Sequence, residues 1–156
     1  MKILVVSDTH GNFDNLYKVV LSHSDADVVI HLGDGANEID QVKTLFPNKM
    51  FVCVKGNCDF GSDKNTTEII TLDGKKIIAS HGHLYNVKYS IYNYICAARA
   101  ENADIALFGH THVAYTDYDD GLYIMNPGSL GKYNASYGLI EICPAGITTN
   151  IIRLKD

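Results

Sequence analysis

The chain lacks any hydrophobic run long enough to cross a membrane. It begins MKILVVSDTH, and this first apolar stretch stops at Val6, too early for the core of a signal peptide or for a membrane span. We therefore expect a cytoplasmic protein with no membrane partner.

The chain also lacks a disulfide or zinc-finger pattern. Its four cysteines contain no Cys-x-x-Cys pair; they are Cys53, Cys58, Cys96 and Cys143. Without a secretion signal, these residues are expected to be reduced thiols.

Positive charge is scarce. The chain has 13 Lys and Arg against 18 Asp and Glu, a net charge of −5. This balance argues against duplex nucleic acid binding through a broad basic face. A phosphate substrate remains open, because metal ions could supply the missing positive charge.

Apolar residues make up an ordinary 46% of the 156 residues. Their order along the chain is typical of an α/β fold. Short Val- and Ile-rich runs predict strands buried on both faces, at 2–7, 27–32 and 50–55. Two amphipathic stretches predict the helices between them. The first has Leu16, Val19, Val20 and His23 on one face, with Asn12 as its N-cap; the second has Ile39, Val42, Leu45 and Phe46, and ends at Pro47.

The second half of the chain changes to hairpins. Paired β-rich runs flank Asp73-Gly74, Asp119-Asp120-Gly121 and Pro144-Ala145-Gly146. A third helix is expected over about 87–102, with Val87, Ile91, Ile95 and Ala98 on one face, followed by a strand at 104–109. We expect a single α/β domain over 1–156 with two β-sheets.

Five apolar strands end in residues that bind metals. They are VVSDTHGN (5–12), VIHLGDG (29–35), VKGNCD (54–59), IASHGH (78–83) and LFGHTH (107–112). In open α/β sheets, ligands gather beyond the carboxyl ends of the strands. Each motif alone is compatible with an ordinary turn or helix cap. Together they would bury several Asp and His side chains at one edge, a cost that divalent metals would offset.

This set of motifs resembles the calcineurin-type metallophosphoesterases, and GNCD with NPGS (126–129) resembles the YfcE-type phosphodiesterases among them. The resemblance implies two β-sheets packed face to face with helices outside. It implies one metal held by Asp8, His10, Asp34 and His112. It implies a second metal held by Asp34, Asn57, His81 and His110, so that Asp34 bridges the two.

The resemblance also implies a reaction. Two ions about 3.5–4 Å apart can clamp a phosphate and generate a metal-bound hydroxide that attacks phosphorus. The ligand types suit Mn²⁺ first, with Ni²⁺, Fe²⁺, Zn²⁺ or Co²⁺ as alternatives. The expected activity is hydrolysis of a small phosphodiester, with catalytic roles for Asp34, Asn57, Cys58 and His81.

Other residues near the motifs keep two interpretations each. Asn12 and His83 are candidates for substrate contact, but Asn12 could be only a helix cap and His83 only part of a surface turn. Cys58 stands where the wider family usually has His, and is either a substrate contact or an inert residue. His31 lies in an apolar run, which favours a hydrogen-bonded core histidine, and residues 126–129 favour a supporting turn.

Two rival functions are carried forward. One is a phosphomonoesterase using the same site. The other is a non-catalytic interaction scaffold, similar to the retromer subunit of this fold, whose metal site is eroded. The complete set of seven ligands argues against the scaffold, and the sequence leaves a homo-oligomer open.

Overall fold

The computed structural model of this chain describes residues 1–131 and 133–155 and has two five-stranded β-sheets. The first sheet has the order β10-β9-β1-β2-β3, with β1 (Lys2–Val6), β2 (Val28–His31), β3 (Met50–Cys53), β9 (Ser136–Cys143) and β10 (Gly146–Arg153). The second has the order β4-β5-β6-β8-β7, with β4 (Thr67–Leu72), β5 (Lys75–Ser80), β6 (Ile105–Phe108), β7 (Tyr115–Asp119) and β8 (Leu122–Asn126). The helices are α1 (Phe13–Ser22), α2 (Ala36–Leu45), α3 (Tyr92–Ala100) and a short 3₁₀ helix (His83–Tyr85).

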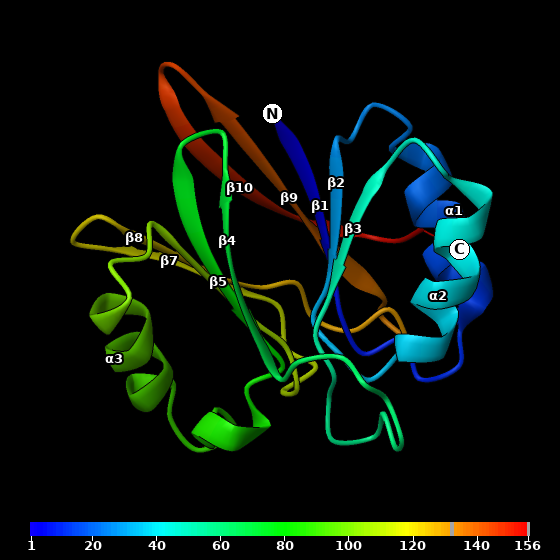
Figure 1. Cartoon of the computed structure of the whole chain (residues 1–156), viewed down its shortest axis with the longest axis horizontal. Helices are drawn as coiled ribbons and strands as arrows, with labels where there is room; N and C mark the ends of the chain where they lie inside the picture. Colours follow the sequence, from blue (N-terminus) through cyan, green and yellow to red (C-terminus); the bar gives the residue numbers. More distant parts are fainter. Residues whose placement is uncertain (132, 156) are drawn as a thin grey trace.

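Parallel pairing in the centre of each sheet sets the direction of the strands that matter for function. In the first sheet β1, β2 and β3 are parallel, and in the second β5, β6 and β8 are parallel. The hairpin partners β10 and β9, β4 and β5, and β7 and β8 are antiparallel. Both sheets therefore direct the carboxyl ends of their parallel strands to one end of the molecule, the lower end in Figure 1.

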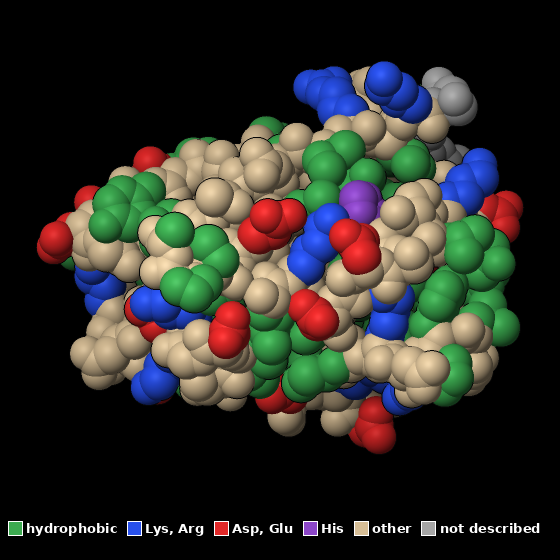
Figure 2. Space-filling model, turned by 90° about the horizontal axis from the view of Figure 1, so that it is seen from above, with side chains coloured by type: hydrophobic (Ala, Val, Ile, Leu, Met, Phe, Trp, Pro, Cys, Tyr) green, Lys and Arg blue, Asp and Glu red, His purple; other side chains and the backbone are tan. Residues whose placement is uncertain are grey.

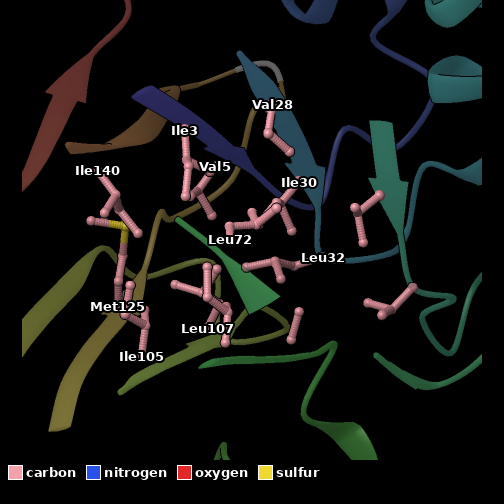
Figure 3. Packing of buried hydrophobic residues seen from close by; sticks show 14 of the residues in the cluster. Ile3, Val5, Val28, Ile30, Leu32, Leu72, Ile105, Leu107, Met125 and Ile140 are labelled. Atoms are coloured by element: carbon pink, nitrogen blue, oxygen red, sulfur yellow. The ribbon is translucent and has the colours of Figure 1, made fainter. Parts of the chain in front are cut away.

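The two sheets pack face to face over an apolar core. Ile3 and Ile30 of the first sheet meet Leu107 and Met125 of the second, and all four are fully buried (Figure 3). Because alternate residues of a strand face opposite sides, Leu4 in β1 faces the helices instead. Burial on both faces explains why the strand runs are apolar throughout.

The helices lie on the outer faces of this sandwich (Figure 1). Helix α1 packs Leu16 and Val19 onto the outer side of the first sheet. Helix α3 packs Tyr94 and Ala98 onto the outer side of the second. The predicted architecture of two packed β-sheets flanked by helices is confirmed.

All three predicted hairpins are present, whereas the third helix differs from its prediction. It begins at Tyr92, not near residue 87, because Asn86 has a left-handed backbone with a φ of 56° that interrupts any helix there. Val87 is buried in the turn before the helix. The Ser90 hydroxyl accepts the Tyr92 N–H at 3.2 Å, in the turn that leads into the helix.

One residue assigned to the buried face of α2 is also misplaced. Ile39 and Val42 are buried, but Leu45 at the end of the helix is 54% exposed. Six residues after Ile39, at about 100° per residue, Leu45 has rotated away from the apolar stripe.

The face opposite the carboxyl ends of the strands carries mixed charge. Figure 2 shows this face, with Lys and Arg side chains interspersed with Asp and Glu and with apolar groups. On this face, the basic side chains drawn in colour do not join into a continuous surface. No helix in the described ranges is both long enough and apolar enough to span a membrane.

Candidate metal centre

The five strand-end motifs meet at one edge of the sandwich. Strands β1, β2 and β3 bring three of them from the first sheet, and β5 and β6 bring two from the second. Figure 1 shows the loops after these strands converging at the lower end of the molecule. The site therefore lies across the junction between the two sheets.

A first group of donors comes from the loop after β1 and the loop after β6. The Nε2 atoms of His10 and His112 lie 3.1 Å apart. Asp8 Oδ1 lies 3.1 Å from His112 Nε2 and 3.7 Å from His10 Nε2. One small cation could contact all three side chains.

A second group gathers around His81. Its Nε2 atom lies 3.4 Å from Asp34 Oδ2, 3.1 Å from His110 Nδ1 and 3.1 Å from Asn57 Oδ1. Asp34, His81 and His110 have donor atoms close enough to hold one ion. Asn57 adds an amide oxygen at the same place.

Asp34 connects the two groups. Its Oδ2 atom lies 3.9 Å from His10 Nε2 in the first group as well as 3.4 Å from His81 Nε2 in the second. Its Oδ1 atom accepts the backbone N–H of Cys58 at 2.8 Å, which fixes the orientation of the carboxylate. The structure thus brings together all seven side chains expected from the sequence.

The donor atoms fit divalent metal ions. Asp8 Oδ1 is buried and has no hydrogen-bond partner within the described ranges, although burying a carboxylate oxygen unpaired is costly. The separations of 3.1–3.4 Å match the spacing of neighbouring ligands around an ion bound at about 2.0–2.1 Å, roughly 3.0 Å for octahedral and 3.4 Å for tetrahedral coordination. Carboxylate, imidazole and amide oxygen also suit Mn²⁺, Fe²⁺, Zn²⁺, Ni²⁺ and Co²⁺.

Protonation at the second group follows from its charges. Burial opposes ionisation of Asp34, but the His81 hydrogen bond and the Cys58 N–H outweigh it and hold the Asp34 pKa well below its usual range. Burial likewise opposes a charged His81, yet the hydrogen bond to Asp34 and the charges of Asp8 and Asp34 raise the His81 pKa. Burial, and then the positive charge of His81, lower the His110 pKa to about 4. A cation would take over the role of the His81 proton, since metal ligands must be deprotonated.

Five of the seven residues have a left-handed backbone. The φ values are 53° for Asp8, 45° for His10, 55° for Asp34, 68° for His110 and 60° for His112. This region is uncommon for residues other than glycine, and such conformations gather at functional sites. The loops that hold them need strong support from neighbouring groups.

Asp59 supplies one such support, which the sequence did not reveal. Its Oδ2 atom accepts the N–H groups of Asp34 and Gly56, and its Oδ1 atom accepts those of Gly35 and Ala36, at 2.7–2.9 Å. One carboxylate thus joins the loop after β2 to the loop after β3. A Cβ at Gly56 would overlap Asp34 Oδ1, so this position requires glycine.

Glu38, whose role the sequence also did not reveal, supports the loop that carries His10. Glu38 Oε1 accepts the Thr9 hydroxyl at 2.9 Å and the backbone N–H of Gly11. Thr9 Oγ1 in turn lies 3.2 Å from His31 Nε2. His31 Nδ1 accepts the N–H of Gly33, and burial lowers the His31 pKa to about 4. The expected hydrogen-bonded core histidine is confirmed.

The NPGS segment is a supporting turn, as the sequence favoured. Ser129 Oγ donates to the Asp8 carbonyl at 2.7 Å. Asn126 Nδ2 donates to the Gly109 carbonyl at 2.9 Å and to Thr111 Oγ1 at 3.0 Å, on either side of His110. The turn holds the loops of both donor groups.

The remaining candidates lie beside the donors. Asn12 is the N-cap of α1, accepting the Asn15 N–H at 3.1 Å, and also lines a hollow next to His10. The His83 ring lies 5.4 Å from that of His81, and its Nδ1 atom is buried without a hydrogen-bond partner in the described residues. The side chain of Cys58 is exposed.

Comparison with known proteins gives one family. The sequence model of the calcineurin-like phosphoesterase superfamily domain matches residues 1–144. The probable metallophosphoesterase YsnB of Bacillus subtilis is 34% identical over 132 residues, covering 83% of this chain and 75% of YsnB. The phosphodiesterase YfcE of Escherichia coli is 25% identical over 183 aligned positions, covering 100% of this chain and 94% of YfcE.

Solved structures share the fold. A conserved Streptococcus pneumoniae protein, described as a predicted phosphoesterase, superposes with a TM-score of 0.83 at 28% identity, covering 97% of this chain and 88% of that one. Vps29 of Entamoeba histolytica, in complex with Zn²⁺, superposes with a TM-score of 0.76 at 22% identity, covering 98% of this chain and 99% of Vps29. At 22% identity, this likeness to Vps29 shows that the two chains share a fold.

Proposed function

The chain belongs to the calcineurin-like phosphoesterase superfamily, and from that membership we propose that it is a hydrolase that uses two divalent metal ions and prefers phosphodiesters. Curated relatives carry the names phosphodiesterase and metallophosphoesterase, which supports hydrolysis of phosphate esters. Preference for the diester is our inference from the residues of this chain.

The proposed ligands are the two donor groups described above. The first ion would be held by Asp8, His10, Asp34 and His112, and the second by Asp34, Asn57, His81 and His110. Mn²⁺ is the proposed ion. When bound, two such ions neutralise the charge of a phosphate and lower the pKa of the water that attacks it.

The completeness of both donor groups carries this proposal. All seven side chains point to one place, and the Asp34 carboxylate reaches both groups. A non-catalytic scaffold, the alternative that the Vps29 likeness brings to mind, needs the fold but has no use for seven converging metal donors that include a buried, unpartnered carboxylate oxygen. A bound cation would give the buried Asp8 Oδ1 atom the partner that it lacks among the described residues.

The diester preference rests on Cys58. Its N–H orients Asp34, and its Sγ atom lies within 4.8 Å of donor atoms of His10 and Asp34, beside both donor groups. Burial and the nearby Asp34 carboxylate raise the Cys58 pKa, which keeps the thiol neutral. A neutral thiol gives no positive charge to bind a monoester dianion, and its S–H is a weak donor. A diester with a good leaving group carries less negative charge than a monoester and needs little protonation, so it depends less on a positive charge and on a strong proton donor at this position.

The test compares two chromogenic esters. The protein is stripped with a chelator, reloaded with Mn²⁺ or another divalent ion, and assayed on bis(p-nitrophenyl) phosphate and p-nitrophenyl phosphate. We expect metal-dependent turnover with a higher kcat/KM on the diester. A higher kcat/KM on the monoester would favour the phosphomonoesterase, and no turnover with any ion would favour the scaffold.

A further inference from the structure

A cavity that is partly open to solvent lies beside the donor groups on the α2 side. It has a volume of about 630 Å³ and starts at His10, Asp34 and Cys58. It continues between the first turn of α2 and the loop formed by residues 58–64. In Figure 1 this loop lies at the lower end of the molecule, near the start of α2. The volume is in the range of small-molecule sites, about 300–1,000 Å³.

Acidic side chains dominate the lining. Five carboxylates face one lysine; the carboxylates are Asp34, Glu38, Asp40, Asp59 and Asp63. Asp34 belongs to the proposed metal centre, and Glu38 and Asp59 are occupied by loop hydrogen bonds. Asp40 pairs with the lysine, Lys64, at 2.6 Å. The exposed carboxylate of Asp63 thus leaves the outer cavity negative.

An aromatic side chain in the cavity lining is exposed to solvent. Phe60 lines the cavity, and 91% of its surface is exposed. Its loop is well anchored, since the Ser62 N–H donates to the Asp59 carbonyl and Lys55 Nζ donates to the Ser62 carbonyl. The exposed ring therefore stands on an anchored loop, where a flat apolar group entering the cavity could cover it.

We propose that this cavity is the leaving-group pocket of the enzyme and selects phosphodiesters whose leaving alcohol is aromatic or apolar and carries no negative charge. The proposal rests on the proposed function. Phe60 supplies the contact surface for the alcohol. Asp63, with the other carboxylates, repels an alcohol that bears a carboxylate or a second phosphate, and tolerates a neutral or cationic one.

The kinetic test uses two methyl aryl phosphates in which the ring is the only large group. One is methyl 4-nitrophenyl phosphate, and the other carries an additional carboxylate on the ring. Intrinsic reactivity cancels when the ratio of their kcat/KM values is compared between variants. We expect Asp63→Asn to shift this ratio about three- to tenfold toward the carboxylate substrate, the scale of one removed charge at partly solvated range. An unchanged ratio would overturn the charge selection.

The contact with Phe60 has its own variant and control. Phe60→Ala should lower kcat/KM for methyl 4-nitrophenyl phosphate about five- to tenfold, mainly through KM, as expected for losing a partly exposed aromatic contact. Leu21→Ala removes an apolar side chain that is 52% exposed, in the last turn of α1 away from His10, and should change nothing. Equal kinetics for Phe60→Ala and wild type would overturn the role of the ring.

A binding measurement separates this proposal from the proposed function. Zn²⁺-loaded protein with ¹³C-labelled phenylalanine is titrated with methyl benzylphosphonate, in which a CH₂ group replaces the leaving oxygen so that the ring cannot be released, and with its 4-carboxy analogue. The chain has five phenylalanines, and Phe60→Leu assigns the Phe60 signal. We expect the Phe60 signal to shift, with at least about threefold weaker binding of the carboxylate. A static Phe60 signal, or equal affinities, would overturn the pocket even if turnover is observed; a shifting signal without turnover would leave the pocket and refute the hydrolase.

Discussion

Asp8 Oδ1 lies 3.1 Å from His112 Nε2, although the two residues come from loops of different sheets. The oxygen has no hydrogen-bond donor among the described residues. A carboxylate and an imidazole in this position are arranged for a shared cation, and the same is true of Asp34 and His81 on the other side of the centre.

The first prediction is that metal-loaded protein contains two divalent ions per chain and is stabilised by them. At a free ion concentration 100 times Kd, one site adds about 2.7 kcal/mol to the free energy of unfolding. Elemental analysis and thermal unfolding with and without a chelator check both points. A ratio well below one ion per chain, with an unchanged Tm, would contradict the metal centre.

The second prediction ranks two ligands. Asp34→Asn should lose more activity than His112→Asn, because the Asp34 carboxylate reaches both donor groups and His112 reaches one. Circular dichroism should show both variants folded, since neither side chain belongs to the apolar core. Equal residual turnover in the two variants would argue against a bridging Asp34.

The third prediction concerns Cys58. Cys58→His should raise the ratio of monoester to diester turnover, because an imidazole restores both positive charge and proton donation. Cys58→Ala should leave turnover of an activated diester within about tenfold, a barrier change near 1.4 kcal/mol. If Cys58→His leaves the ratio unchanged, the diester preference has another origin.

The fourth prediction is that Glu38 positions the ligand loop. Glu38→Ala leaves the Gly11 N–H and the Thr9 hydroxyl without their acceptor, so metal affinity should fall about 10- to 100-fold. Glu38→Gln keeps an oxygen acceptor and should lose less. Calorimetric titration with Mn²⁺ measures this, with Gln41→Ala on the exposed side of α2 as the control. Wild-type affinity in Glu38→Ala would assign the residue no positioning role.

The fifth prediction is a pH dependence of the metal-free chain. The folded pKa of His31 is about 4, below the unfolded value of about 6.5, so the unfolded state binds its proton first as pH falls. Stability is therefore lost from about pH 6.5 down to pH 4, by roughly 2–3 kcal/mol between pH 6.5 and pH 4.5. His31→Gln should flatten this part of the profile, as urea unfolding in chelator would show. Identical profiles in both proteins would exclude His31 as the source.

The sequence predicted the gathering of Asp8, Asp34 and His81 because parallel strands place their carboxyl ends together, and strand-end residues are visible in the pattern. It could not predict Glu38, since an acid in the first turn of a helix is already explained by the helix dipole. The role of Asp59 was hidden for a related reason: its partners are backbone N–H groups, which every residue has.

The start of the third helix was also beyond what the sequence pattern could predict. The apolar spacing of Val87, Ile91 and Ile95 fits a helix, but periodicity does not report the left-handed turn at Asn86. Ser90, a residue type that is common just before helices, was the available signal for the true boundary.

The placement of the centre across the junction of the two sheets has a consequence for how the chain opens. The first sheet supplies Asp8, His10, Asp34 and Asn57, while the second supplies His81, His110 and His112. Separating the sheets would break both donor groups at once. Bound ions would therefore link the two sheets, which would then open as one cooperative unit. Amide protons in β1 and β6 would exchange with solvent through the same opening event.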